Sequence, residues 1–201
     1  METKKMTRSR FDRRVQALPG QLRSLDDADT GEPVIEGYFA VFDSDYPIWP
    51  GCIERVAPGA FASSLQSNDV RALCDHETRI VLGRTAAGTL ALKEDERGLF
   101  GRITINRDDV DAMNLYARVK RGDVSQCSFG FDITDEEYIQ NPDGTTMYYI
   151  RDMVLYEVSV VTFPAYEATS VEARAMDREA GRRSAMELWR KTMKEKLKCL
   201  N

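Results

Sequence analysis

The chain has 201 residues, of which 42% are hydrophobic and 30% are charged, and its formal net charge is −5. These values fit one globular domain with a proper core plus extensions better than two domains. No apolar run approaches the ~20 residues that span a bilayer, and the N-terminal segment METKKMTRSRFDRR lacks the apolar part of a secretory signal, so we expect a soluble, cytoplasmic protein with no membrane partner.

Both ends of the chain are basic. Residues 1–14 contain six Lys or Arg against two acids, residues 174–201 contain nine against four, and the body between them has 13 basic and 27 acidic residues. Basic tails can bind nucleic acid, but they are also common as solvated termini, which is the interpretation we favour here. We therefore expect residues 1–30 to form a flexible basic extension and nucleic-acid binding to be absent.

Residues 31–165 are predicted to be mainly β-strand. Period-2 alternation bounded by turn residues indicates strands at 33–43, at 88–95 and 98–106 as a hairpin, at 123–140 turning at the NPDG segment, and at 153–163. Two helices are predicted between them, APGAFASSL with Pro58 in its first turn and DDVDAMNLYARVKRG with Gly122 as its end. The fold class is therefore mainly β with inserted helices (α+β), as a closed or nearly closed β-barrel.

Residues 166–201 have a different composition, poor in β-branched residues and rich in helix formers. Apolar residues recur there every three or four positions and predict a C-terminal helix with one apolar stripe: Met186, Trp189, Met193, Leu197 and Leu200. Such a helix can pack on the barrel, lie in a partner's groove or, less well, lie on a membrane surface.

A metal or cofactor site is not expected. The cysteines, at positions 52, 74, 127 and 199, form no CxxC pair, and a single histidine leaves too few ligands for a zinc site.

The segment DVSQCSFGFDI (123–133) places Cys127 and Ser128 side by side. Alternation in a strand directs Cys127 inward with Phe129 and Phe131, whereas Ser128 shares the other face with Gly130, which leaves room for another group to approach. Ser128 is then either an ordinary strand serine or a nucleophile, and a nucleophilic serine requires a base.

The only histidine, His76, is the obvious base. We place it on a strand from Val70 to Glu77, at the end of a mostly apolar face, where a structural role is also possible. A third group would orient the imidazole, and Glu157, an acid within an apolar strand, is the first choice because a buried charge needs a partner.

Glu157 could instead pair with an arginine such as Arg84 or Arg151. Asp75 and Asp132 are weaker choices for the third group, since Asp75 points away from the face of His76 and Asp132 fits less well.

Six segments occur in an order and spacing that resembles the prohead proteases of HK97-like tailed bacteriophages over residues 33–170: EGYFAVFDS, ERVAPGAFASSL, DHETRIVLGRT, ERGLFGRI, VKRGDVSQCSFGF and LYEVSVVTFPAYEAT. The resemblance implies a serine endopeptidase with the barrel fold of the herpesvirus assemblin proteases, Ser128 as nucleophile and His76 as general base. The herpesvirus relatives use a second histidine as third member; this chain has none, so we assign that role to Glu157. The family often has Ile or Val where this chain has Phe129.

The resemblance also implies a role in capsid maturation. Its partners would be the major capsid protein with its scaffolding region and, by self-cleavage, the chain itself, acting inside the procapsid in the host cytoplasm. Residues 1 to about 30 and those after about 165 would then be removable propeptides. Two alternatives remain open: a non-enzymatic assembly module on the same fold, and a cysteine hydrolase using Cys127, which alternation disfavours.

Overall fold

The computed structural model describes residues 14–18, 22–28, 30–49, 51–141 and 144–163, and all of them belong to one unit, Met1–Ala165. The predicted C-terminal helix over residues 166–201 lies outside the described residues.

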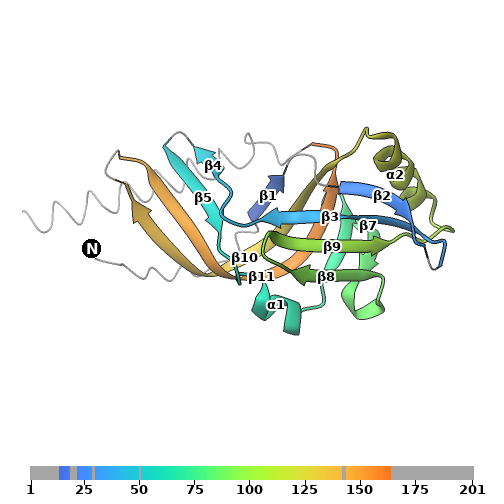
Figure 1. Ribbon diagram of the computed structural model, residues 1–201, viewed down its shortest axis with the longest axis horizontal. Helices are drawn as coiled ribbons and strands as arrows, with labels where there is room; N and C mark the ends of the chain where they lie inside the picture. Colours follow the sequence, from blue (N-terminus) through green and yellow to red (C-terminus); the bar gives the residue numbers. More distant parts are fainter. Residues whose placement is uncertain (1–13, 19–21, 29, 50, 142–143, 164–201) are drawn as a thin grey trace, which may run out of the picture. The chain divides into compact units, whose positions relative to one another are not determined.

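The described strands form two sheets (Figure 1). The larger sheet runs β1 (Arg14–Leu18), β10 (Gln126–Gln140), β11 (Thr146–Val161), β5 (Cys52–Val56) and β4 (Tyr46–Trp49), with β6 (Arg71–Cys74) paired to β11 and β7 (Glu77–Arg84) to β6. The smaller sheet runs β2 (Leu22–Asp26), β3 (Pro33–Val41), β9 (Gly98–Thr104) and β8 (Leu90–Glu94).

The turns of both long hairpins agree with the sequence, but the last strand, predicted at 153–163, begins at Thr146. Strands β8 and β9 pair antiparallel on either side of Glu96 and Arg97, and β10 pairs antiparallel with β11 from Gln126 to Val161. The described strands begin earlier than residue 31, because β1 pairs with β10 and β2 pairs with β3. Five-residue strands show too little alternation to be distinguished from a solvated tail.

Strand β2 is held to the smaller sheet by charge as well as by backbone pairing. Glu36 on β3 is 5% exposed, and its carboxylate accepts hydrogen bonds from Arg23 of β2 (2.6 Å) and Arg102 of β9 (2.6 Å). A carboxylate buried this deeply needs such partners, because an unpaired charge there would be costly.

Two strands share one edge of β11. Strand β5 pairs with its first part, Thr146–Ile150, and β6 pairs with Glu157–Val160. Between them the short helix α1 (Ala62–Ser67) supplies the missing partners, since Ser64 Oγ donates to Met153 O (2.6 Å) and accepts from Leu155 N (2.9 Å). The buried backbone of β11 is thereby satisfied where no strand reaches it. Helix α1 starts at Ala62, one turn later than the Pro58 start that the sequence favoured.

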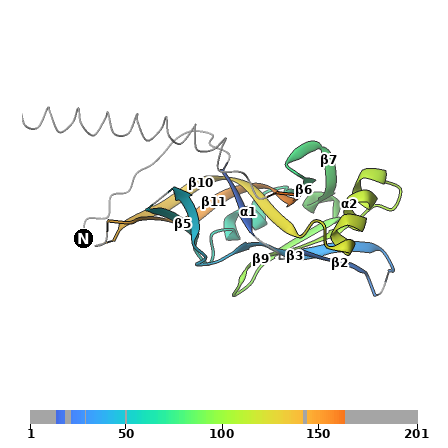
Figure 2. The same cartoon turned by 90° about the horizontal axis from the view of Figure 1, so that it is seen from above.

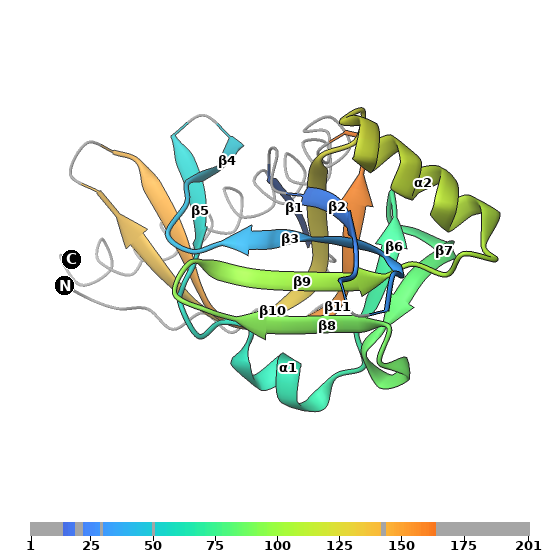
Figure 3. The ribbon, with the colours of Figure 1, turned by 45° about the vertical axis from the view of Figure 1, so that its right-hand side comes forward.

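Helix α2 (Val110–Arg121) has both of its predicted ends. The Asp109 carboxylate accepts from the amides of Asp111 and Ala112, and Gly122 adopts φ +88, the left-handed conformation that ends a helix most easily with glycine. The helix packs beside β2, β3 and β7 (Figure 3). No helix among the described residues is long and apolar enough to cross a membrane.

The core combines side chains from both sheets. Phe129 stacks on Phe131 with ring centroids 4.9 Å apart, and Phe61 meets Phe129 edge to face at 5.6 Å. Ile35 and Leu99 of the smaller sheet belong to the same buried cluster. The mainly β class with two short helices agrees with the sequence analysis. The described strand pairs form two separate sheets, and closure into a barrel stays a prediction.

Candidate functional site

The two faces of β10 differ sharply in chemistry. Cys127, Phe129 and Phe131 are all fully buried within the hydrophobic core, and the Cys127 thiol donates to the carbonyl of Tyr38 (2.9 Å). Ser128 lies on the opposite face, as alternation along the strand requires. We call the face that contains Ser128 the polar face of the β10–β11 pair.

Strand register brings two further polar residues to the polar face. Ser128 is paired with Ser159, and Gly130 with Glu157. Residues opposite each other in an antiparallel pair project from the same side of the sheet, so Glu157 and Ser159 join Ser128 there. All three are buried: Ser128 and Ser159 are 0% exposed and Glu157 is 4% exposed.

Gly130 provides the space for the Glu157 carboxylate. A Cβ at position 130 would lie 2.4 Å from Glu157 Oε1, closer than real contacts allow. The group that approaches this glycine, which the sequence analysis left unidentified, is therefore a carboxylate of the neighbouring strand.

His76 reaches the polar face from a turn. The strand expected from Val70 to Glu77 is present only from Arg71 to Cys74, and its predicted extension through His76 is wrong. Strand β6 ends at Cys74, β7 starts at Glu77, and Asp75 and His76 between them have φ +48 and +61. Positive φ at both central residues is what a two-residue type I′ hairpin demands, and it reverses the chain where alternation assumed a continuous strand.

Glu157 has the histidine as its partner. His76 Nδ1 lies 2.7 Å from Glu157 Oε1, with the histidine side chain 29% exposed and the glutamate side chain 5% exposed. The two arginines considered as alternatives have other partners, because Arg84 binds Asp69 and Arg151 binds Glu137.

Ser159 holds the second oxygen of the same carboxylate. Its hydroxyl donates to Glu157 Oε2 at 2.6 Å. Ser159 was not among the predicted site residues, although its position two residues after Glu157 on the same strand face could have identified it.

The other acids considered for the third position are bound elsewhere. Asp75 accepts from the backbone amide of Thr162 (2.7 Å), and Asp132 accepts from the hydroxyl of Tyr156 (2.8 Å).

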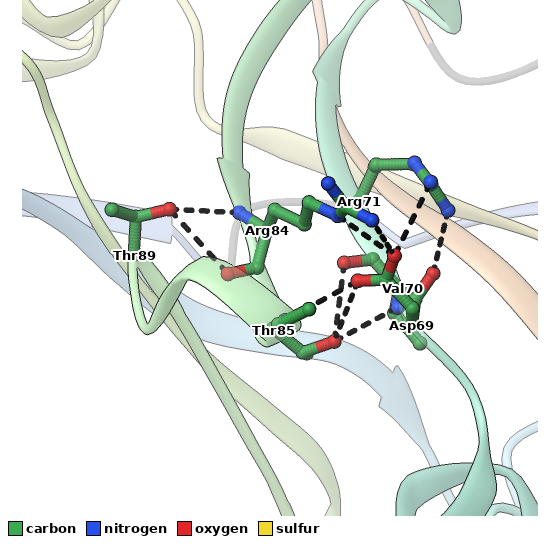
Figure 4. A network of polar contacts seen from close by, with 7 residues as sticks. Asp69, Val70, Arg71, Arg84, Thr85 and Thr89 are labelled. Carbon is green, nitrogen blue, oxygen red and sulfur yellow. Dashed lines mark hydrogen bonds and ion pairs between the residues drawn. The ribbon is translucent and has the colours of Figure 1, made fainter.

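The hairpin that contains His76 is fastened at its base by Asp69, which precedes β6, and by Arg84, which ends β7 (Figure 4). Arg84 Nε donates to Asp69 Oδ2 at 2.7 Å, and Arg71 also lies 3.2 Å from this oxygen. The hydrogen bond from Arg84 is the main reason that the pKa of Asp69 falls to about 2. Across the same base, Val70 N donates to Thr85 Oγ1 at 2.9 Å.

This arrangement leaves one ring nitrogen for chemistry. With Nδ1 against Glu157, His76 Nε2 is buried and has no hydrogen-bond partner among the described residues. A histidine bound at Nδ1 by a buried carboxylate has the orientation and support of a general base, which accepts its proton at Nε2.

The cysteines are poorly suited to attack. Cys127 lies on the core face, away from Glu157, and burial is the main cause that raises the pKa of the Cys74 thiol to about 11, with Asp75 adding to it. Reactive cysteines have a lowered pKa, so neither thiol has the required environment. The described residues contain no group of three or more His, Cys, Asp or Glu side chains able to hold a metal ion.

Comparison with known proteins identifies relatives of this chain. The Caudovirus prohead serine protease family matches residues 20–183. The prohead protease of Enterobacteria phage HK97 is 32% identical over 151 residues, which cover 72% of this chain and 61% of that protein. The structure of the bacteriophage T4 capsid assembly protease, gp21, aligns with 75% of this chain and 99% of that one, at 12% identity and a TM-score of 0.45.

Proposed function

The chain belongs to the Caudovirus prohead serine protease family, and we propose that it is a peptidase with Ser128 as nucleophile, His76 as general base and Glu157 as the acid that orients the base. The observation that supports these roles most is the 2.7 Å contact between His76 Nδ1 and Glu157 Oε1, which leaves Nε2 for proton transfer. Ser128 is two positions from Gly130, against which the same carboxylate packs.

In the first step Ser128 Oγ attacks the carbonyl carbon of a peptide bond while His76 Nε2 accepts the hydroxyl proton. Glu157 keeps Nδ1–H in place and stabilises the imidazolium that forms, and Ser159 fixes the carboxylate through its second oxygen. Because a serine hydroxyl is a weak nucleophile at neutral pH, this proton transfer is essential for attack.

In the second step the peptide C–N bond breaks and the imidazolium returns its proton to the leaving amine. The acyl group stays on Ser128 as an ester until water, deprotonated by His76, hydrolyses it and regenerates the serine. Donors for the oxyanion are usually a large part of the rate. The backbone amide of Arg84 is not open to this role, because it donates to Thr89 Oγ1 (2.9 Å).

The proposed substrate is the major capsid protein with its scaffolding region, and the proposed place of action is the procapsid in the host cytoplasm. The chain spans 61% of the length of its HK97 relative, so the substrate is inferred from the family and from nothing in the site itself. Self-cleavage would remove the N-terminal residues to about 30 and the region after about 165.

The test is co-expression of the chain with the capsid protein, followed over time by gel and intact mass, for wild type, Ser128→Ala and Cys127→Ala. We expect wild type and Cys127→Ala to cut the capsid protein and themselves, and Ser128→Ala to lose at least about 10³-fold of the rate. Cys127→Ala is the matched control, since it alters the neighbouring residue on the core face.

If Cys127→Ala is the only variant that loses cutting, and its chain is folded, the nucleophile is the Cys127 thiol and not Ser128. Intact capsid protein with all three chains, even in assembled procapsids, would contradict the assignment and favour the assembly-module alternative.

A further inference from the structure

One strand of the larger sheet lies directly against Ser128. Strand β1 (dark blue in Figure 2) pairs antiparallel with β10, and the register places Ala17 opposite Ser128 and Leu18 opposite Cys127. On the other side of β10, the partner of Ser128 is Ser159 of β11. Ser128 is therefore enclosed between two strands, and it is 0% exposed.

Strand β1 can leave without disturbing the rest of the sheet. It is the end strand in the order β1-β10-β11-β5-β4, so its strand pairing is with β10 alone, and it also lies close to β3. The chain then passes to the other sheet, where Leu22 N donates to Ser125 O (3.3 Å) and β2 pairs with β3. The part that matches the family starts at residue 20, after β1.

We propose that the edge of β10 beside Ser128 is the substrate-binding edge of this peptidase, and that β1 occupies it as an internal competitor. The ligand class is an extended polypeptide segment, which adds to the sheet antiparallel to β10 in the place of β1. This inference rests on the proposed role of Ser128.

Two physical arguments support this. A polypeptide that adds as a strand is recognised through its main chain, and an unpaired edge of β10 would offer a full row of donors and acceptors to it. An extended substrate must also lie beside the strand that contains the nucleophile, and β1 and β11 fill both of these positions at Ser128 until one of them moves. Strand β11 contains Glu157 and is paired on both sides, so β1 is the strand whose departure preserves the site.

The arrangement gives self-cleavage a regulatory consequence. While β1 is paired, the chain is latent because its own strand fills the substrate edge. An N-terminal segment that is removed no longer competes, since it loses the advantage of an intramolecular strand. Activity should then rise as processing proceeds.

The test uses the full chain with Ser128→Ala, so that nothing is cleaved during binding. Gln16→Pro and Ala17→Pro together weaken the pairing of β1 with β10. Backbone amides of a strand point alternately to its two sides, so one of two adjacent residues donates toward β10. Proline has no N–H, so one of the two substitutions removes that donor. Met6→Pro with Thr7→Pro is the matched control outside β1. Hydrogen exchange is measured for the amides of residues 127–131, with and without a synthetic peptide of residues 12–20, DRRVQALPG.

We expect exchange of the amides that face β1 to be at least about tenfold faster in the β1 variant than in the control, and to slow again when the peptide is added. The alternate amides, which face β11, should stay protected in both chains. With Ser128 intact, the β1 variant should cut the capsid protein several-fold faster than the control. If circular dichroism shows the double-proline chain to be unfolded, Gln16→Gly with Ala17→Gly weakens the strand more mildly.

The proposal would be overturned if β10 exchanges faster in the β1 variant and still fails to bind the peptide. It would also be overturned if the β1 variant, with Ser128 intact, cuts the capsid protein no faster than an active chain with unchanged β1. Peptide binding without cleavage by any chain would refute the serine assignment while supporting the peptide-binding edge.

Discussion

The two faces of the β10–β11 pair are built from the same strands and have opposite properties. On the core face, Cys127, Phe129 and Val158 belong to the buried hydrophobic cluster, and the Cys127 thiol donates to a backbone carbonyl. On the polar face, Glu157 and Ser159 are equally buried but are held by specific polar partners. Neighbouring residues such as Cys127 and Ser128 thus have unrelated roles, because adjacent side chains of a strand project from opposite faces.

The two faces should respond differently to substitution. A core face is stabilised by burial and packing, so its substitutions change the free energy of unfolding. The polar face depends on the relative positions of a few atoms, and small displacements there affect chemistry much more than stability. Activity and stability should therefore separate between the two faces.

The largest effect is expected from Glu157→Gln. An amide can occupy the same space but cannot stabilise the imidazolium of His76, and the loss of the equivalent acid in serine proteases costs about 10⁴-fold in kcat. We expect a fall of about 10³- to 10⁴-fold in kcat for capsid-protein cleavage.

Asp132→Asn is the control for this prediction. Asp132 is an acid of the neighbouring strand whose partner is Tyr156, 2.8 Å away, and not the histidine. If kcat falls equally in Asp132→Asn and Glu157→Gln, the negative charge of this region matters as a whole and Glu157 has no special role.

Gly130→Ala should have the next largest effect. A Cβ 2.4 Å from Glu157 Oε1 must displace the carboxylate, and with it the orientation of His76. A displacement of about 1 Å near a catalytic group costs about 10²-fold in rate, and we expect kcat to fall by that factor with native secondary structure retained by circular dichroism.

The matched control is Gly144→Ala. Gly144 has φ +85 with nothing within 4 Å of an added Cβ, so alanine there strains the backbone without touching the site. A kcat of Gly144→Ala as low as that of Gly130→Ala would mean that lost stability, and not the displaced carboxylate, explains the effect.

Much of this comparison could be predicted from sequence, because alternation is a local property. The separation of Cys127 from Ser128, the β10–β11 hairpin and the unusual position of Glu157 in an apolar strand follow from neighbouring residues alone. The observed contact between His76 and Glu157 agrees with the pair that the sequence singled out, and its catalytic role stays a prediction.

The features that sequence analysis missed depend on register and on turn geometry. The segment around His76 alternates like a strand, but positive φ at Asp75 and His76 reverses the chain there. The pairing of β1 with β10 joins residues more than a hundred positions apart, which no local pattern encodes. Register between distant strands is decided by the packed sheets as a whole.

The smallest predicted effect concerns the base of the hairpin that delivers His76 to the polar face. Arg84 lowers the pKa of Asp69 to about 2, chiefly through its hydrogen bond. Since the folded-state pKa lies below the unfolded value of about 3.9, the pair's contribution to stability is complete above about pH 4. It is lost as the pH falls through about 2.

Asp69→Asn should therefore be slightly less stable than wild type in urea unfolding at pH 7, and the difference should shrink as the pH falls from about 4 to 2. The difference is expected to be small because the ion pair is open to solvent, which screens it. A difference that is unchanged at pH 2 would mean that the carboxylate's charge is irrelevant and that the hydrogen-bond geometry alone fastens the hairpin. In either case the core face should respond little to acid, because its residues have no carboxylate to protonate.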